Sequence, residues 1–407
     1  MQNLLTDMRK YGTIKLYGHN INHRRKGARF PMNFPKVCLR TIPHKPGQRV
    51  LVVSDVHGHA GELRRILEKA SFSDDDLLVI VGDILEKGPD SLGTLRYVMR
   101  LCENGNAIPL IGNVDAWQIT VIDGLNEENA GGFLEYLEGL RRWKGTSFYD
   151  ELAAECGYTL RTADDVLRAK PDIQAHFARE FDFLAGFATV AVGGKYVFVH
   201  GGLREANPAD NLQCDLYALT KYDAFMTSTP HTFENYVIVG HWPVNLYSET
   251  VQQLNPVIDY EKHIIAIDGG CGIKKEGQLN LLILPDLACD ISEISVVTKD
   301  SLPRIRAGEA QTPIAGDSIH INWLTWKVEL LERGDEFSRI RHLHSGWELW
   351  VPNSYLSDDN TRCSDYTDAE LSVQKGDELS LICETSRGCI AKKDGVVGWY
   401  RGTYEKL

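Results

Sequence analysis

The chain has 407 residues, with 44 Lys and Arg against 56 Asp and Glu, and a formal net charge of -12. This length predicts two or three domains, and the hydrophobic content of 43% excludes a disordered or fibrous protein. The acidic balance gives no bulk attraction to nucleic acid, and no apolar run reaches the roughly 18–20 residues of a membrane span. The nine cysteines are scattered, with no Cys-x-x-Cys pair, which favours reduced thiols. We therefore expect a cytoplasmic protein that binds neither membrane nor nucleic acid.

Residues 1–45 are predicted to form a basic N-terminal arm. They hold ten Lys and Arg and one acid, Asp7. Such a charge block either lies on the acidic body of its own protein or recruits an anionic partner. The sequence leaves both alternatives open.

The pattern of residues 46–300 is typical of an α/β domain. Apolar runs at 49–54, 77–82 and 108–112 alternate with stretches of helical periodicity, which predicts a largely parallel sheet. Residues 116–186 carry helical periodicity without strand runs, so we expect a helical insertion there. Strand runs resume after it, with several connections too short for a crossover helix, so some pairs should be antiparallel. We predict a two-sheet α/β sandwich.

Beyond residue 300 the pattern changes to short strands and turns. A linker and a first small barrel are expected at 301–359, and a second barrel at 360–407. The two stretches resemble one another, with Gly-Asp-Glu triplets that begin at Gly334 and Gly376.

Five sequence blocks place polar residues just past apolar strands, where an open α/β sheet binds its ligands. The blocks are SDVHG (Asp55, His57), VGDILEKG (Asp83, Glu86, Lys87), IGNVD (Asn113, Asp115), VHGG (His200) and VGHWP (His241). Two Asp, one Asn and three His are ligands that suit Mn, Fe or Zn. Because six ligands are too many for one open catalytic ion, they predict a binuclear site.

In this order, the blocks D-x-H, GD-x-x-[DE]-[RK]-G, GN, HGG and GH resemble the calcineurin-like metallophosphoesterases. With the IDGGCG block at 267–272, they look most like the phosphoprotein phosphatase branch, over about residues 48–290. The resemblance implies an αββα sandwich and two divalent metal ions, Mn²⁺ first, with Fe or Zn as alternatives. It also implies that a bridging water, its pKa lowered by the two cations, attacks phosphorus in line.

The resemblance assigns a role to each of the six residues. Asp55 and His57 would bind the first metal, and Asp83 would bridge the two ions. Asn113 would bind the second metal. His200 and His241 would complete that second site.

The sequence departs from the family pattern at the residue that binds the phosphate and at the general acid. Lys87 stands where the family usually has a phosphate-gripping Arg, so the charge is kept but the bidentate fork is lost. Val114 replaces the His that usually protonates the leaving oxygen, and Glu86, which would orient that His, has lost its partner. His59, near a helix start, is either a substitute proton donor or a solvated residue.

Without a general acid, a poor leaving group such as a seryl alkoxide departs slowly. We therefore expect a metal-dependent phosphoprotein phosphatase that favours phosphotyrosine or aryl phosphates. The alternatives are a dinucleoside polyphosphate hydrolase and a metal-binding pseudophosphatase that acts as an interaction protein.

Residues 360–407 resemble an SH3 module. On that resemblance Tyr366, Trp399 and Tyr404 would form an aromatic groove for a Pro-rich peptide partner. The alternative is that these aromatic side chains pack the barrel or its interface with the catalytic domain.

Overall fold

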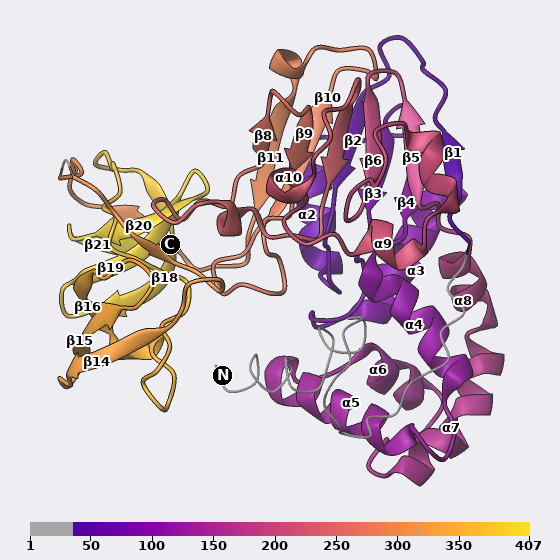
Figure 1. The fold of residues 1–407 in the computed structure, drawn as a ribbon, viewed down its shortest axis with the longest axis horizontal. Coiled ribbons are helices and arrows are strands. Elements are labelled where there is room, and N and C mark those ends of the chain that lie inside the picture. The colour runs from indigo at the N-terminus through magenta and orange to yellow at the C-terminus, as the bar shows by residue number, and fades with distance from the viewer. Residues whose placement is uncertain (1–35, 315) are drawn as a thin grey trace.

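The computed structural model describes residues 36–314 and 316–407. Most of the basic arm predicted at 1–45 therefore lies outside the described residues. Figure 1 shows a two-sheet body, a group of helices at one end of it, and smaller sheets of the C-terminal part beside it. None of the helices in the described ranges is both long and apolar enough to cross a membrane.

Six strands form the first sheet, in the order β1-β5-β6-β7-β9-β8. They are β1 Leu39–Thr41, β5 Val190–Gly193, β6 Tyr196–Val199, β7 Tyr236–Val239, β9 Ile264–Ala266 and β8 Val257–Asp259. The pairs β1–β5, β6–β7 and β7–β9 are parallel, whereas β5–β6 and β8–β9 are antiparallel. The mixed pairing predicted from the short connections is confirmed.

Five strands form the second sheet, in the order β11-β10-β2-β3-β4. They are β11 Ser295–Lys299, β10 Leu279–Leu284, β2 Val50–Val53, β3 Leu77–Val81 and β4 Ala107–Leu110. β2, β3 and β4 are parallel because a helix connects each to the next, and β10 joins antiparallel to β2 and β11.

The two sheets pack face to face, with helices on both outer faces. In β2, Val50 and Val52 belong to the core between the sheets, while Leu51 and Val53 face the covering helices. The helices on the second sheet are α2 Ala60–Lys69 and α3 Ser91–Glu103, and those on the first sheet are α9 Leu216–Thr220 and α10 Phe225–Ser228. The predicted αββα sandwich is confirmed.

Five helices follow β4, where the sequence predicts a helical insertion. They are α4 Asn113–Gly124, α5 Ala130–Lys144, α6 Phe148–Glu155, α7 Ala163–His176 and α8 Ala178–Ala185. Ser147 and Thr162 cap α6 and α7 by accepting hydrogen bonds from backbone N–H groups of the first turn. Phe133 and Phe177 belong to the same apolar cluster as Leu51 of the sheet, so the insertion is continuous with the sandwich core.

The C-terminal part consists of three small sheets. They contain β20 Val396–Tyr400, β19 Gly388–Lys393, β18 Glu378–Thr385, β12 Arg304–Ala307 and β21 Tyr404–Lys406; β13 His320–Ile321 and β17 Tyr366–Thr367; and β14 Val328–Glu332, β15 Phe337–His342 and β16 Glu348–Pro352.

The segments 301–359 and 360–407, expected as separate barrels, are joined in the structure. β12 of the first segment lies between β18 and β21 of the second, and β13 pairs with β17. One apolar cluster holds Phe337 of the first segment and Trp399 of the second. The repeat in the sequence did not indicate this union, because pairing between distant strands leaves no local pattern.

Two of the three aromatic residues predicted to form a peptide groove lie in this core. Tyr366 and Trp399 are each 3% exposed, and Trp399 Nε1 donates to the carbonyl of Thr367 at 3.1 Å. Tyr404 is half-buried and its hydroxyl bonds Glu384 Oε1 at 2.7 Å. Tyr366 and Trp399 therefore follow the alternative in which the aromatic side chains pack the fold.

Candidate metal centre

The strands of both sheets deliver the predicted ligands to one edge of the sandwich. Asp55 lies two residues after β2, Asp83 two after β3, and Asn113 begins α4 just after β4. His200 directly follows β6, and His241 lies two residues after β7. In sheets of this kind the carboxyl ends of parallel strands are where ligands bind.

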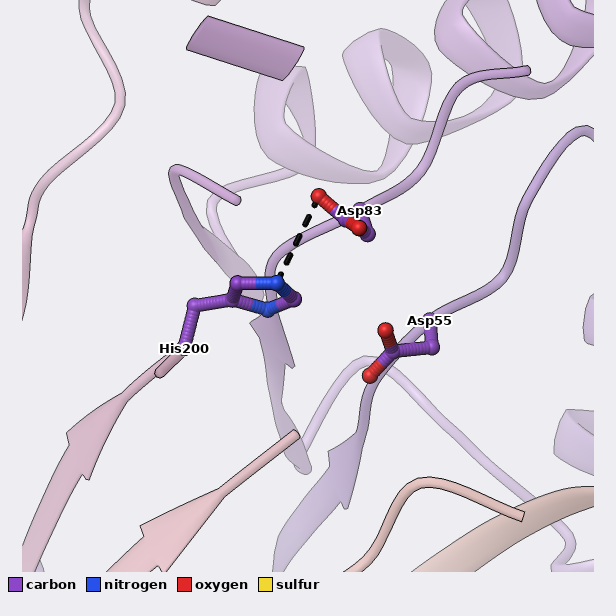
Figure 2. Close-up of side chains that lie close together, drawn as sticks. All are labelled: Asp55, Asp83 and His200. Atoms are coloured by element: carbon purple, nitrogen blue, oxygen red, sulfur yellow. Dashed lines mark ion pairs between the residues drawn. The ribbon is translucent and has the colours of Figure 1, made fainter. Parts of the chain in front are cut away.

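Asp55, Asp83 and His200 form the centre of this cluster. One ligand atom from each lies within 4.8 Å of the others, and all three residues are buried. Figure 2 shows them pointing toward one another from three chain segments, with His200 Nε2 3.5 Å from Asp83 Oδ1.

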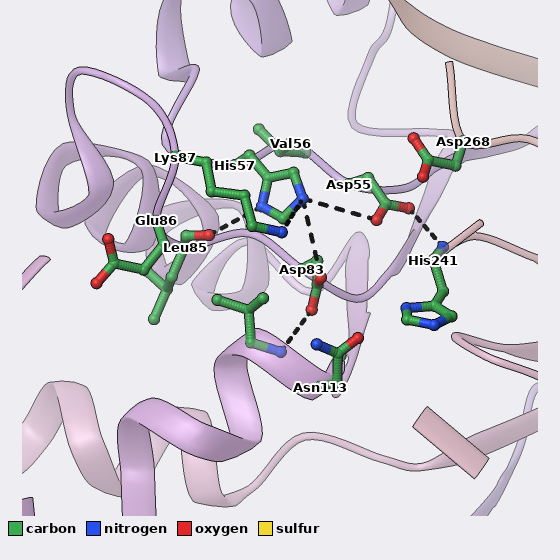
Figure 3. A network of polar contacts seen from close by, with 12 residues as sticks. Asp55, Val56, His57, Asp83, Leu85, Glu86, Lys87, Asn113, His241 and Asp268 are labelled. Atoms are coloured by element: carbon green, nitrogen blue, oxygen red, sulfur yellow. Dashed lines mark hydrogen bonds and ion pairs between the residues drawn. The ribbon is translucent and has the colours of Figure 1, made fainter. Parts of the chain in front are cut away.

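His57 and Asn113 lie on either side of Asp83. The Nε2 atom of His57 is 3.8 Å from Asp55 Oδ1 and 3.8 Å from Asp83 Oδ2. On the other side, Asn113 Oδ1 is 3.3 Å from His200 Nε2. Asp83 thus lies between two sets of ligands (Figure 3), the place that a bridging carboxylate needs.

Backbone carbonyls fix the orientation of both imidazoles. His57 Nδ1 lies 3.0 Å from the carbonyl of Leu85, and His200 Nδ1 lies 2.8 Å from that of Val81. A hydrogen bond at Nδ1 leaves Nε2 directed at the centre, which is the usual arrangement of metal-binding histidines.

His241 reaches the cluster from the loop after β7 of the first sheet. Its backbone N–H donates to Asp55 Oδ2 at 3.0 Å, and the centre of its ring lies 5.4 Å from that of the His200 ring. Burial lowers the pKa of His241 to about 4, so the ring is neutral, as a metal ligand must be. Its Nε2 lies 2.8 Å from Asp223 Oδ1 and 3.5 Å from Lys221 Nζ.

Asp223 and Lys221 were missed by the sequence reasoning. They occur in LTKYDAF, between two short helices, where no strand end or spacing marks them. Their contacts with His241 orient that ring, and Lys221 Nζ is itself ion-paired with Asp223 Oδ1 at 2.9 Å. The signal available was weak, a Lys-x-Asp in an otherwise apolar stretch.

The backbone at the site is strained. Left-handed φ angles occur at Asp55, His57, Asp83, Glu86, Lys87 and His241. Each such residue costs about 1–3 kcal/mol and persists where the surroundings hold it. The surroundings here are tight, because a Cβ at Gly82 would lie 2.6 Å from His200 Nδ1, and one at Gly112 would collide with Asp83.

The charges of the cluster call for a cation. Burial raises the pKa of Asp55 to about 6, and Asp55 Oδ1 accepts no hydrogen bond from any described residue. Burial acts on Asp83 in the same direction, but His200 outweighs it and holds the pKa of Asp83 below its usual range. Burial lowers the pKa of His200, and the two carboxylates outweigh it and raise that pKa to about 9. The donor set itself, two carboxylates with imidazole nitrogens and an amide oxygen, fits divalent transition-metal ions, which would take the place of the proton on His200.

Two of the residues predicted to be catalytic lie beside this cluster. Lys87 Nζ is 3.2 Å from His57 Nε2, so a second cationic side chain borders the site. His59 turns its Nδ1 toward the carbonyl of His57 at 2.6 Å and is half-buried. Its role as a proton donor stays a prediction.

Glu86, the third, faces the helical insertion. It is 1% exposed, and its Oε1 accepts from Gln118 Nε2 at 2.9 Å and from the N–H of Phe148 at 3.2 Å. These contacts make Glu86 a positioning residue that ties the loop after β3 to α4 and α6. The sequence could not indicate this because α6 lies far along the chain.

Val114 and Asp115 support the same loop. The N–H of Val114 donates to Asp83 Oδ1 at 2.9 Å. Asp115 accepts from the N–H groups of Ile84, Leu85 and Gly112 at 3.1–3.2 Å. The start of α4 therefore fixes the carboxylate of Asp83.

Lys144, at the end of α5, is a further cation near the site that the sequence did not reveal. Its ammonium lies 4.3 Å from the centre of the Trp143 ring, and it has no ion pair in the described part of the chain. Burial and then the charge of Lys87 lower its pKa to about 8, while Cys271 acts on it in the opposite direction. The charges of the loop after β3 and of the 268–278 loop therefore act on Lys144.

Comparison with known proteins agrees with this geometry. The calcineurin-like phosphoesterase family matches residues 48–266, more than half of the chain. The chain belongs to this family. The expected enzyme class, a hydrolase acting on phosphoric ester bonds, is confirmed, and the family uses a binuclear divalent metal site.

Individual relatives are more distant. The chain is 40% identical over 74 residues to the symmetrical bis(5'-nucleosyl)-tetraphosphatase of Aeromonas hydrophila. The matched stretch covers 18% of this chain and 26% of that protein. A protein serine/threonine phosphatase from Saccharomyces cerevisiae has a TM-score of 0.39 at 14% identity, covering 70% of this chain and 87% of that one. A cold-active protein-tyrosine phosphatase from a Shewanella species has a TM-score of 0.35 at 15% identity, covering 69% and 87%.

Replacing Gly112 with Ala should weaken metal binding. The added Cβ collides with the carboxylate and the N–H of Asp83, so Asp83 must move. We expect the dissociation constant for Mn²⁺, measured by calorimetric titration, to rise about ten-fold or more. Gly131→Ala on α5, where the new Cβ meets no atom within 4 Å, should leave it unchanged. Equal affinities in the two variants would contradict this account of Asp83.

Glu86→Gln should change how stability depends on pH. Burial raises the pKa of Glu86 from 4.5 to about 8. Because the folded pKa is raised, the stability contributed by the protonated carboxyl is complete below pH 4.5 and is lost as pH rises through about 8. Gln cannot ionise, so the free energy of unfolding of the variant, relative to that of the wild type, should rise between pH 5 and pH 9 by at least about 1.4 kcal/mol, the value of one pKa unit. Urea unfolding at both pH values measures this difference, with exposed Glu128→Gln as the control. A difference between variant and wild type that is the same at both pH values would refute the prediction.

Proposed function

We propose that the protein is a metal-dependent phosphoprotein phosphatase of the phosphoprotein phosphatase branch that favours phosphotyrosine and other aryl phosphates. The observation that carries the proposal is Val114. It is 6% exposed, follows Asn113 and bonds Asp83 through its N–H, yet its side chain has no proton to give.

Two divalent cations, Mn²⁺ first with Fe or Zn as alternatives, would lower the pKa of water, supply a nucleophile at neutral pH and polarise the phosphoryl group. Asp55 and His57 would hold one cation, and Asn113, His200 and His241 the other. The chain's own contribution is orientation, because carbonyls and strained turns fix each ligand before substrate arrives.

Two lysines next to the cluster would bind the phosphoryl oxygens. Lys87 Nζ lies beside His57, and Lys221 Nζ lies beside His241, so the cations border opposite parts of the site. A Lys acts as a point charge without the bidentate fork of Arg. Phosphate would therefore be attracted strongly but oriented loosely.

The leaving group must depart as an anion or take its proton from water. A positioned general acid is worth about 10²–10⁴ in rate, and its loss falls most heavily on poor leaving groups. A phenol, with a pKa of about 10, leaves far more easily than a seryl alkoxide. This difference is the basis of the proposed preference.

The C-terminal β part carries a weaker proposal, an SH3-like site for a Pro-rich peptide. Burial of Tyr366 and Trp399 gives it little support, and half-buried Tyr404 is the candidate that is left of the three.

Phosphotyrosine and phosphoserine peptides of one sequence test the main proposal. With Mn²⁺ present, phosphate release from the phosphotyrosine peptide should be faster by about 10² or more. Asp83→Asn serves as the blank. Comparable rates would contradict the leaving-group argument, and no turnover on either peptide with metal bound would favour a pseudophosphatase.

A dinucleoside polyphosphate hydrolase is the second candidate, because its leaving group also needs no acid. Two observations favour it: the stretch of 40% identity to a symmetrical bis(5'-nucleosyl)-tetraphosphatase, and the effect of the Lys87 charge on Lys144, a third cation. A substrate with several phosphates would bind Lys144 beyond the phosphoryl group held by Lys87.

Lys144→Met separates this candidate from the first. If a polyphosphate is the substrate, kcat/KM for diadenosine tetraphosphate should fall about ten-fold while that for p-nitrophenyl phosphate stays within two-fold. Arg142→Gln is the matched control, since Arg142 is on the same helix and exposed, with Glu138 as its partner. Equal losses on both substrates would count against a polyphosphate contact at Lys144.

A further inference from the structure

The loop 268–278 forms one wall of the metal centre. Asp268 is fully buried beside Asp55 (Figure 3), and its carbonyl accepts the N–H of Val244, three residues after His241. Gly272 lies against His57, because a Cβ there would be 3.0 Å from His57 Cβ. Movement of this loop would therefore displace ligands on both sides.

The same loop is anchored in the C-terminal β part by a buried ion pair. Lys274, whose side chain is fully buried, places its Nζ 2.6 Å from Asp365 Oδ1 and 3.3 Å from the centre of the Trp323 ring. Trp323 Nε1 donates to the other oxygen, Asp365 Oδ2, at 3.0 Å. Asp365 is thus held from two directions and in turn fixes Lys274.

Backbone hydrogen bonds connect Lys274 to the part of the loop beside the site. Its N–H donates to the carbonyl of Gly270 at 2.9 Å, and the N–H of Gln278 closes the loop on the carbonyl of Gly269 at 3.0 Å. These two hydrogen bonds connect residues 274–278 to Gly269 and Gly270, which follow Asp268 directly.

A second anchor follows the His241 turn. Residues 252–254 pair with 395–397, with N–H to carbonyl bonds from Leu254 to Gly395 and from Val397 to Gln252, both 2.8 Å. The side chain of Leu254 is buried in the C-terminal core. Gln252 Nε2 also donates to Glu276 Oε1 at 2.7 Å, which joins the two anchored segments.

We propose that the C-terminal β part positions the wall of the metal centre, with Asp365 as the positioning residue. Through Lys274 it holds the 268–278 loop against His57 and Asp55, so the affinity for divalent cations depends on this distant ion pair. Only the turnover measurement of this inference rests on the function proposed above. The metal affinity is measured without substrate and does not depend on it.

Asp365→Asn in the full chain tests the inference. We expect the dissociation constant for Mn²⁺, from calorimetric titration, to rise about ten-fold. The KM for p-nitrophenyl phosphate should stay within two-fold, and kcat should recover at saturating Mn²⁺, which a general loss of structure would not produce. Glu384→Gln, which removes an exposed ion pair with Lys406 in the same part of the chain, should leave the metal affinity unchanged. Wild-type affinity in folded Asp365→Asn overturns the proposal.

A second variant covers the case in which Asp365→Asn does not fold, since it leaves the buried charge of Lys274 unpaired. The paired change Lys274→Met with Asp365→Asn removes both charges, so circular dichroism should match the wild type. We expect the same ten-fold weakening of Mn²⁺ binding, because the anchor is lost. If the paired variant is folded and binds Mn²⁺ like the wild type, the ion pair does not position the site. Should neither protein turn over substrate, the metal titrations still decide the inference.

Discussion

The carboxylate of Asp83 is the constraint on which the rest of the site depends. It is 2% exposed, has a left-handed backbone, and lies within 4 Å of nitrogen atoms from His57 and His200. A buried carboxylate is costly unless it is paired with donors or cations, and these two imidazoles provide such partners. The N–H of Val114 supplies one more. The start of α4 and the ends of three strands must therefore meet at a fixed distance.

The residues predicted to bind metal and those expected to assist the leaving group differ in how the structure places them. All six predicted ligands lie at one sheet edge, although their role as ligands stays a prediction. Glu86, which the resemblance pairs with a general acid, is instead hydrogen-bonded to Gln118 and to the first N–H of α6. The residue thus stabilises the helical insertion against the site. Val114 supports Asp83 through its backbone N–H, a contact that does not depend on the side chain at this position.

The C-terminal β part differs from an appended module. A separate module would contact the catalytic part through a small polar surface. Here a segment of the catalytic part adds an edge to the C-terminal sheet, and Leu254 completes its core. A buried Lys274–Asp365 pair accompanies this contact. One of the two segments, the 268–278 loop, also contacts the candidate metal centre at His57, through Gly272.

The sequence by itself determined the sandwich and the group of residues at its edge. Strand periodicity and the polar residue after each strand are local patterns, and parallel strands bring their ends together wherever the helices between them pack. Only the tertiary structure decided the surroundings of Asp83 and the partners of Glu86. It also decided the contacts of Lys144, Lys221 and Asp365. These residues follow no strand end, and their positions depend on which helix or sheet packs against the loop. The two predicted barrels became one unit for the same reason, because strand pairing across a long loop is set by core packing.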